Sequence, residues 1–306
     1  MSIEKTNAKN IETIAEALKF CVHALENSDV FYGHGTDNAW DEALQLVLTV
    51  CELPLDSGDD VLAYTLSPAS CQQIKLLLER RIAQHIPLPY LLGRAWFAGL
   101  EFKCDERAII PRSPLAQLIL DEFKPWYGGA EPSRVLDLCC GGGCIGLAAA
   151  HYFPQLRVDL ADLDQSALQL ARENASLLGL GERVSFIHSN LFEAIEPAKY
   201  DIIVSNPPYV NASDLATMPA EYHHEPELSL GSGPDGLSIT CHILQRAGSY
   251  LSDNGLLVVE VGNSWPDLET LYAKVPFTWL EFASGGQGVF TLSAKELQQF
   301  SATFRG

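Results

Sequence analysis

The most informative segment of the chain reads Tyr200-Asp201-Ile202-Ile203-Val204-Ser205-Asn206-Pro207-Pro208-Tyr209-Val210. Its apolar run, Ile202 to Val204, shows no alternation of polar and apolar residues, which is typical of a strand covered on both faces. Neither Pro207 nor Pro208 can donate a hydrogen bond to a neighbouring strand, so the strand has to end before them. Functional sites of open α/β sheets lie beyond the carboxyl ends of their strands. The segment therefore predicts a buried strand that delivers a rigid turn to such a site.

The turn from Asn206 to Tyr209 carries the groups needed to hold a planar nitrogen that bears two hydrogens. The side-chain oxygen of Asn206 can accept one hydrogen, and the backbone carbonyl of Pro207 can accept the other. The ring of Tyr209 can pack on the bound group and exclude water. We therefore predict catalytic roles for Asn206, Pro207 and Tyr209. Substrate contacts are predicted from the same residues and from Pro208. A plain Pro-Pro turn with an exposed aromatic residue is the alternative.

Residues 131–306 alternate strand and helix patterns on both sides of this segment. Further strands are predicted at Arg134–Leu138, Arg157–Ala161, Val184–His188, Leu256–Val261, Thr278–Phe282 and Val289–Leu292. Helices are predicted from Cys144 onward, at Ser166–Leu178 and at Leu237–Leu251. This order predicts an α/β fold with a mostly parallel sheet, helices on both faces and a closing antiparallel pair.

The pattern of residues 1–90 predicts an all-helical domain, and the family resemblance described below implies that this domain recognises the substrate. Apolar residues recur at helical spacing in three stretches, and Asn38 and Ser67 are predicted helix caps. The sequence pattern of residues 91–130 predicts a linker between this domain and the α/β region. It contains a β-hairpin of Glu101–Asp105 with Ala108–Ile110, followed by a helix at Leu115–Phe123.

A glycine turn follows the first strand of the α/β region, in Asp137-Leu138-Cys139-Cys140-Gly141-Gly142-Gly143-Cys144-Ile145-Gly146. Its spacing matches the dinucleotide fingerprint, so a nicotinamide-dependent dehydrogenase is one interpretation. However, Asp137 would bring a negative charge close to the pyrophosphate of such a cofactor. S-adenosylmethionine has an ammonium group and no phosphate, and it suits this carboxylate better. We therefore predict S-adenosylmethionine, with close backbone approach at Gly141 and Gly143.

Polar residues after the next two strands complete the predicted cofactor site. Asp162 lies 19 residues after Gly143, near the offset of roughly 20 at which an acid meets ribose hydroxyls. Asn190 can bind an adenine edge while Leu191 and Phe192 pack on the ring, and Asp164 is predicted to cap a helix. A solvated strand end is the alternative for Asp162. The predicted cofactor-binding residues are Asp137, Cys139, Gly141, Gly143, Asp162, Asn190, Leu191 and Asn206.

Taken together, the stretch Asp137 to Gly146, Asp162 and the turn Asn206 to Tyr209 resemble the HemK-type glutamine methyltransferases. The likeness covers nearly the whole chain and includes Ile110-Pro111-Arg112, Glu225 to Leu228 and Asp235 to Leu237. It implies the class I S-adenosylmethionine-dependent fold, with a Rossmann-like, mostly parallel seven-stranded sheet. It also implies methyl transfer to the side-chain amide nitrogen of a glutamine. Two positions depart from the family pattern: Cys139 stands where the first glycine is usual, and Asn190 where an acid is usual.

Two further stretches look like one branch of that family. Tyr32 to Asn38 and Arg112 to Leu115 resemble the branch that methylates the third large-subunit ribosomal protein. The release-factor branch usually continues its Pro-Arg stretch with proline and acidic residues, and a release-factor glutamine methyltransferase is the runner-up. Adenine-N6 DNA methyltransferases share Asn-Pro-Pro-Tyr and are the less favoured alternative.

The net charge of the chain indicates which class of partner it can bind. The chain has 20 Lys and Arg against 39 Asp and Glu, a net charge of −19. Nucleic-acid binding depends on basic residues that neutralise phosphates, so a DNA partner is disfavoured and a basic ribosomal protein, before or during assembly, is favoured. Residues 1–10 lack an apolar signal core, and no run of about 18 apolar residues occurs. We therefore predict a cytoplasmic protein without membrane contact. The crowded cysteines at 139, 140 and 144 predict no metal site.

Overall fold

The computed structural model describes residues 11–128, 131–283 and 285–305. The chain divides into two compact units. One runs up to Ala95 and also includes Pro219–His224. The other consists of Trp96–Met218 together with the chain from Glu225 onward. Residues 91–130 are therefore divided between the two units instead of forming a linker of their own.

The first unit is helical. Its helices are α1 (Ile14–Glu26), α2 (Ala39–Val50), α3 (Pro68–Gln84) and α4 (Leu88–Leu92), with 3-10 turns η2 (Asp59–Ala63) and η3 (Ala220–His224). The predicted caps are confirmed, because the side chains of Asn38 and Ser67 accept hydrogen bonds from backbone amides in the first turns of α2 and α3. A cluster of buried apolar side chains, including Leu18, Leu46 and Ile74, holds these helices together.

The boundary between the units falls within a two-stranded sheet of β1 (Arg94–Phe97) and β2 (Leu100–Lys103). The predicted hairpin of Glu101–Asp105 with Ala108–Ile110 is therefore wrong. The chain reverses earlier, because Ala98 and Gly99 both adopt positive φ angles, 49° and 76°. Ala108–Ile110 forms no strand, and the amide of Ile110 instead donates to a carboxylate oxygen of Glu225 at 3.0 Å.

The second unit is built on a seven-stranded sheet of order β5-β4-β3-β6-β7-β9-β8. Its strands are β3 (Arg134–Leu138), β4 (Arg157–Asp162), β5 (Val184–His188), β6 (Tyr200–Ser205), β7 (Leu251–Glu260), β8 (Thr278–Trp279) and β9 (Val289–Ser293). The pairs among β3 to β7 are parallel, whereas β9 is antiparallel to both β7 and β8. The predicted fold is thus confirmed, including the closing antiparallel pair.

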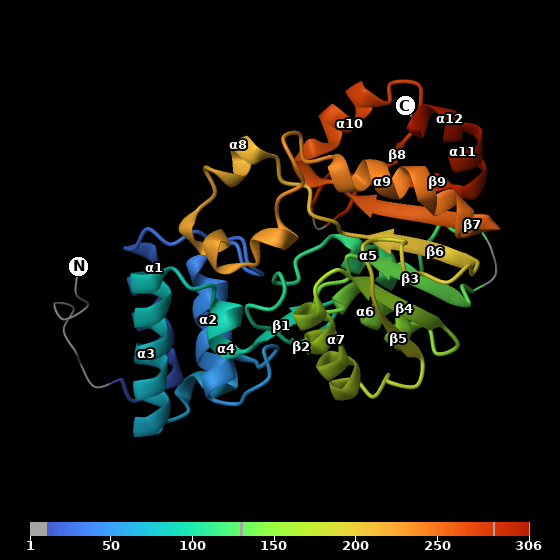
Figure 1. Ribbon diagram of the computed structural model, residues 1–306. Helices are drawn as coiled ribbons and strands as arrows, with labels where there is room; N and C mark the ends of the chain where they lie inside the picture. Colours follow the sequence, from blue (N-terminus) through green and yellow to red (C-terminus); the bar gives the residue numbers. More distant parts are fainter. Residues whose placement is uncertain (1–10, 129–130, 284, 306) are drawn as a thin grey trace. The chain divides into compact units, whose positions relative to one another are not determined.

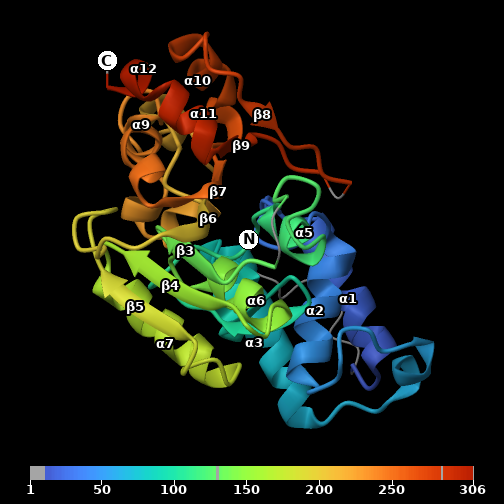
Figure 2. The ribbon, with the colours of Figure 1, turned by 90° about the vertical axis from the view of Figure 1, so that its right-hand side faces the viewer.

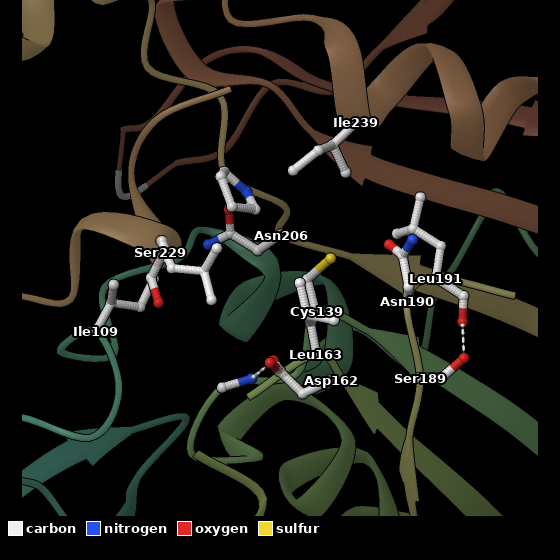
Figure 3. Close-up of a pocket in the computed structure, with 13 residues that line it drawn as sticks. Ile109, Cys139, Asp162, Leu163, Ser189, Asn190, Leu191, Asn206, Ser229 and Ile239 are labelled. Atoms are coloured by element: carbon white, nitrogen blue, oxygen red, sulfur yellow. Dashed lines mark hydrogen bonds between the residues drawn. The ribbon is translucent and has the colours of Figure 1, made fainter. Parts of the chain in front are cut away.

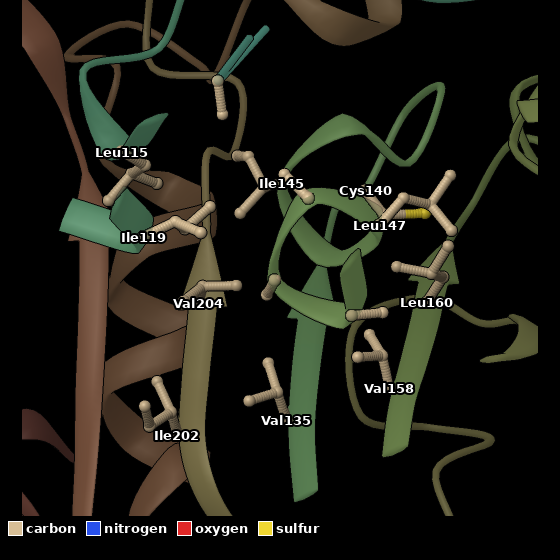
Figure 4. Close-up of a cluster of buried hydrophobic side chains, with 14 of the residues drawn as sticks. Leu115, Ile119, Val135, Cys140, Ile145, Leu147, Val158, Leu160, Ile202 and Val204 are labelled. Carbon is tan, nitrogen blue, oxygen red and sulfur yellow. The ribbon is translucent and has the colours of Figure 1, made fainter. Parts of the chain in front are cut away.

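Helices cover both faces of this sheet (Figures 1 and 2). The helices of the unit are α5 (Leu115–Leu120), α6 (Cys144–Tyr152), α7 (Gln165–Leu177), α8 (Ala212–Leu215), α9 (Ser238–Arg246), α10 (Trp265–Leu271), α11 (Ala294–Gln299) and α12 (Ser301–Phe304), with 3-10 turns η4 (Glu227–Ser229), η5 (Ala247–Ser249) and η6 (Gly262–Ser264). Side chains of α5, α6 and α7 pack on one face (Figure 4). Side chains of α9 to α12 pack on the other. The central strands β6 and β7 are covered on both faces, so buried apolar residues follow one another without alternation at Ile202–Val204 and Leu256–Val259.

One predicted element is too long. The helix predicted at Leu237–Leu251 ends at Arg246, and β7 already begins at Leu251. Leu251 is drawn into the sheet because it pairs with Tyr200 at the start of β6. Within the part of the chain that the structure describes, no helix combines the length and apolar character needed to span a membrane.

Candidate active site

A pocket opens in the second unit where β3, β4, β5 and β6 end (Figure 3). Each of these strands contributes residues that directly follow it. The lining consists of Ile109, Cys139, Gly141, Asp162, Leu163, Ser189, Asn190, Leu191, Asn206, Pro208, Leu228, Ser229 and Ile239. The structure thus brings together most of the predicted site residues. Asp137, Gly143, Pro207 and Tyr209 are not part of this lining.

The glycine turn between β3 and α6 forms one wall. Cys139, Gly141 and Gly143 have φ angles of 57°, 53° and 81°, in the region that favours glycine. A Cβ atom on Gly141 would meet nothing closer than 3.7 Å, so its backbone lies open toward the pocket. A Cβ on Gly143 would come within 3.0 Å of Ala171. Gly143 therefore serves helix–sheet packing, and the prediction that it contacts the cofactor directly is not supported.

Asp137 lies behind this wall and not on it. It shares a face of β3 with Val135, which packs toward α6, so its carboxylate points beneath the helix. One oxygen accepts from the amide of Gly146 at 2.8 Å, and the other has no hydrogen-bond partner among the described residues. Burial raises the pKa of Asp137 to about 7. The predicted contact with the ammonium group of the cofactor is not supported, and Asp137 instead ties the start of α6 to β3.

Asp162 stands at the end of β4 on the pocket wall. One carboxylate oxygen accepts from the amide of Gly141 at 2.8 Å, the bond drawn at Asp162 in Figure 3. The other accepts from the amide of Asp164, also at 2.8 Å. These bonds fix the orientation of the carboxylate, and burial raises its pKa. Each oxygen keeps a second lone pair for a hydroxyl donor. Asp164 caps α7 as predicted, since its side chain accepts from the amide of Ser166.

Asn190 and Leu191 follow β5 and line the pocket. The amide group of Asn190 donates to Glu193 at 3.0 Å. Ser189 shapes the turn, because its hydroxyl donates to the carbonyl of Leu191 at 2.7 Å. Phe192, by contrast, is buried and stacks on Tyr250 with ring centroids 4.7 Å apart. The prediction that Phe192 packs on a cofactor ring is therefore wrong, and only Leu191 is available from this turn.

Asn206 is the first residue after β6, and Figure 3 shows its side chain among the pocket-lining residues. Its carboxamide makes no hydrogen bond to any residue that the structure describes. Pro207 and Pro208 are buried, and Pro208 reaches the pocket. The carboxamide is thus available to a ligand while the backbone behind it is stiff.

Tyr209 is held away from the lining by the end of β7. Its hydroxyl donates to Glu260 at 3.0 Å. Its ring lies against the backbone of Gly262, where an added Cβ would come within 2.4 Å of the ring. The prediction that the ring packs on the substrate is not supported by these contacts.

Apolar residues missed at the level of sequence complete the pocket: Ile109, Leu163, Leu228 and Ile239. Ile109 adjoins the family stretch Ile110-Pro111-Arg112, and Leu228 ends the family stretch that begins at Glu225. Those matches were therefore the available signal. For Leu163 and Ile239, the only signal in the sequence is their position: Leu163 follows a strand, and Ile239 lies near the start of a helix.

Comparison with known proteins shows which family the chain belongs to. The family model "Methyltransferase small domain" matches residues 116–221. A ribosomal protein uL3 glutamine methyltransferase of Francisella tularensis subsp. tularensis is 42% identical over 297 residues, covering 97% of this chain and 95% of that protein. A protein of the same name from Neisseria gonorrhoeae is 43% identical over 291 residues, covering 95% and 97%. The chain belongs to the uL3 glutamine methyltransferase family.

Among solved structures, a methyltransferase from Pyrococcus furiosus is similar at 16% identity and a TM-score of 0.47. The match covers 74% of this chain and 98% of that one.

This chain is an S-adenosylmethionine-dependent methyltransferase. The pocket fits that cofactor. Its lining includes the carboxylate of Asp162 and the carboxamide of Asn190, but no Lys or Arg side chain. A ribose and an adenine therefore find polar partners, whereas the pyrophosphate of a nicotinamide cofactor would find no basic side chain among the described lining residues. The dehydrogenase interpretation is not supported.

Proposed function

We propose that the chain transfers a methyl group from S-adenosylmethionine to the side-chain amide nitrogen of a glutamine in ribosomal protein uL3. Identity of 42–43% over at least 95% of the chain to two proteins of that name supports the substrate. The observation that carries the chemistry is the carboxamide of Asn206, which stands in the pocket beside the cofactor-binding residues without a hydrogen-bond partner among the described residues.

In this proposal the cofactor is held by the turns after β3, β4 and β5. Asp162 accepts hydrogen bonds from the ribose hydroxyls, and Asn190 binds the adenine edge. Leu191 and Leu163 cover the adenine ring on the apolar side of the pocket. Cys139 and Gly141 allow close backbone approach.

The substrate glutamine is positioned by Asn206 and Pro207. The oxygen of the Asn206 carboxamide accepts one amide hydrogen, and the Pro207 carbonyl accepts the other. This holds the nitrogen lone pair, otherwise delocalised into the amide carbonyl, toward the methyl group. When bound, S-adenosylmethionine would supply an electrophilic methyl on a sulfonium. The nitrogen–methyl bond would form as the sulfur–methyl bond breaks, with that electron pair left on the departing sulfur, and the nitrogen would release one hydrogen as a proton to water. Positioning of this kind can lower the barrier by about 7–11 kcal/mol.

No nucleophilic thiol is part of the proposal. Burial raises the pKa of Cys139, Cys140 and Cys144, so these thiols stay protonated at neutral pH. A protonated thiol is a poor nucleophile, and direct transfer to the amide nitrogen fits the site better than a covalent intermediate.

The partner is proposed to be the free ribosomal protein or an early assembly precursor in the cytoplasm. A chain of net charge −19 attracts a basic protein and is repelled by a surface rich in phosphates. The same charge disfavours DNA as the substrate.

Three parallel incubations with labelled cofactor test the substrate. They contain free uL3, finished ribosomes and a release factor, each with the wild type and with Asn206→Ala. We expect label in free uL3, at one glutamine, and none with the variant. Label found mainly in the release factor would overturn the substrate. Equal label in finished ribosomes would overturn the proposal that methylation occurs before assembly is complete.

A further inference from the structure

Glu260, the last residue of β7, is buried, and its carboxylate accepts hydrogen bonds from two hydroxyl groups. Tyr209 donates to one oxygen at 3.0 Å, and Ser113 donates to the other at 2.5 Å. Tyr209 ends the Asn-Pro-Pro-Tyr turn, and Ser113 precedes α5. Glu260 therefore joins the turn to a segment almost 100 residues earlier in the chain.

Two further contacts hold Tyr209 in this place. The hydroxyl of Ser264 donates to the backbone carbonyl of Tyr209 at 2.8 Å. The ring rests on Gly262, and no larger residue would leave room for it. Hydroxyl, carbonyl and ring are thus all fixed by the segment from Glu260 to Ser264.

The segment that carries Ser113 is itself firmly held. Arg112, next to it, donates to both oxygens of Glu225, at 2.5 and 2.7 Å. Glu225 also accepts from the amide of Ile110. Paired contacts between a guanidinium and a carboxylate are directional, so Ser113 is presented to Glu260 from a rigid support.

Asn206 has no comparable support of its own. Its carboxamide has no hydrogen-bond partner among the described residues, so its orientation follows the backbone of the turn. At the start of the turn, the hydroxyl of Ser205 donates to the carbonyl of Leu138 at 2.8 Å. At its end, Tyr209 is bound to Glu260. The two proline residues transmit these constraints, because their φ angles are fixed.

We propose that Glu260, supported by Ser113, is a positioning residue for methyl transfer that acts through the hydroxyl of Tyr209 on the orientation of Asn206. The inference rests on the proposed function, in which Asn206 holds the substrate amide. Glu260 touches neither substrate nor cofactor in this scheme. A displacement of about 1 Å at a reacting group can slow a reaction about 100-fold, so a group two steps from the chemistry can control its rate.

A double-mutant cycle of Glu260→Gln and Tyr209→Phe tests the proposal. Each single variant is expected to lower kcat about tenfold, while the KM for the cofactor stays unchanged. The double variant is expected to be no slower than the slower single variant, since both break the same link. Losses that multiply in the double variant, or an unchanged kcat in Glu260→Gln, would overturn the proposal.

Tyr200→Phe is the matched control. Tyr200 is buried at the start of β6, the strand that leads into the turn, and also donates its hydroxyl to a carboxylate, Asp159, at 2.7 Å. This variant should lower the Tm and leave kcat unchanged. A fall of kcat in the control equal to that of Glu260→Gln would show that the effect is general destabilisation, which also overturns the proposal.

Hydrogen exchange separates this inference from the proposed function, because it needs no substrate. In Glu260→Gln, the amides of Asn206, Tyr209 and Val210 should exchange faster, while those of β3 and β4 stay protected. Faster exchange confined to this turn would support the link even if uL3 were not the substrate. Unchanged exchange there would refute it even if uL3 were methylated.

Discussion

Two buried carboxylates near the glycine turn have different surroundings, although they lie near the ends of the neighbouring strands β3 and β4. Asp162 accepts two backbone hydrogen bonds and lies on the pocket wall. Asp137 accepts one, keeps an oxygen without a partner among the described residues, and is fully buried. The difference follows from the direction in which each side chain leaves its strand. At the residue scale, one carboxylate can therefore serve the ligand and the other the fold.

Asp162→Ala should weaken binding of S-adenosylmethionine by about 1.5–3 kcal/mol, because a charge-assisted hydrogen bond to the ribose is lost. Calorimetry measures the effect. Asp164→Ala is the control, because the side chain of Asp164 caps α7 while its backbone amide, which donates to Asp162, is kept in the variant. This substitution should reduce stability without changing affinity. An unchanged affinity in Asp162→Ala would contradict the assigned role.

Asn206→Ala should abolish methyl transfer and leave cofactor affinity nearly intact, because the carboxamide is assigned to the substrate amide. Asn206→Asp should also be inactive or nearly so, since a carboxylate in this pocket has to be desolvated and disturbs the held amide. Single-turnover rates and calorimetry on the same preparations check both statements. Turnover near that of the wild type in either variant would refute the positioning mechanism.

Asp137→Asn should change how stability depends on pH. Burial raises the pKa of Asp137 from its ordinary value of 3.8 to about 7. The folded state therefore retains a proton that the unfolded state loses, and the wild type loses stability as pH rises from about 4 to 7. An asparagine does not ionise. The free energy of unfolding of the variant should therefore rise relative to that of the wild type by about 2–4 kcal/mol over this range.

Denaturant unfolding at pH 4, 5.5, 7 and 8 measures this difference. A difference between the two proteins that stays constant with pH would mean that Asp137 titrates normally.

At the scale of elements, the chain after the Asn-Pro-Pro-Tyr turn enters the helical unit as η3 and then returns to the second unit. Glu221 of η3 is 1% exposed and accepts from Arg81 of α3 at 2.9 Å. Arg81, 2% exposed, also donates to Glu42 of α2 at 2.6 Å. Burial raises the pKa of Glu42 despite Arg81, whereas hydrogen bonds from Arg81 and Phe31 outweigh burial and lower the pKa of Glu221. One guanidinium thus holds two carboxylates from distant elements.

The stretch from Tyr32 to Asn38, which marks the branch at the level of sequence, packs against the same segment. The ring of His34 lies 4.5 Å from that of Tyr222, and a Cβ on Gly33 would come within 3.1 Å of the Tyr222 hydroxyl. A residue larger than glycine at position 33 would therefore have to displace the rings of Phe31 and Tyr222.

Arg81→Met should destabilise the helical unit by about 3–5 kcal/mol, because two buried carboxylates are left without their cation. Arg80→Met, a change of the same kind at an exposed neighbour in α3, should change the free energy of unfolding by less than about 0.5 kcal/mol. Denaturant unfolding followed by circular dichroism distinguishes them. Similar losses in the two variants would show that the buried network contributes little.

At the scale of the whole molecule, we expect charge to govern the encounter with the proposed basic substrate. The chain has 39 acidic and 20 basic residues, and its net negative charge attracts a basic protein. This attraction acts over long distances and is weakened by salt. Specificity for one glutamine cannot come from this field, because the field acts on any basic protein. It has to come from the pocket and the surfaces beside it.

The rate constant kcat/KM for free uL3 should therefore fall about tenfold or more between 50 mM and 300 mM salt, with little change in kcat at saturating substrate. A series with a neutral osmolyte in place of salt is the control for viscosity and water activity. A rate that does not depend on salt would contradict electrostatic steering.

Short-range signals in the sequence were enough for much of the molecule. The apolar run before two prolines predicted β6, and Asn38, Ser67 and Asp164 predicted helix caps, because backbone preferences depend on residues a few positions apart. The carboxyl ends of parallel strands meet at one edge of a sheet, so the same signals also brought Asp162, Asn190 and Asn206 to one pocket.

Only the tertiary structure decided which side chains pair across long stretches of the chain. Tyr209 is bound to Glu260, 51 residues away, and Arg81 is bound to Glu221, 140 residues away. Asp137 turned out to lie under α6, although its position at a strand end predicted a place on the wall. Such partners depend on how distant segments pass one another and on which face of a strand a side chain leaves. A buried polar group must find a partner wherever the packing of the whole chain places one.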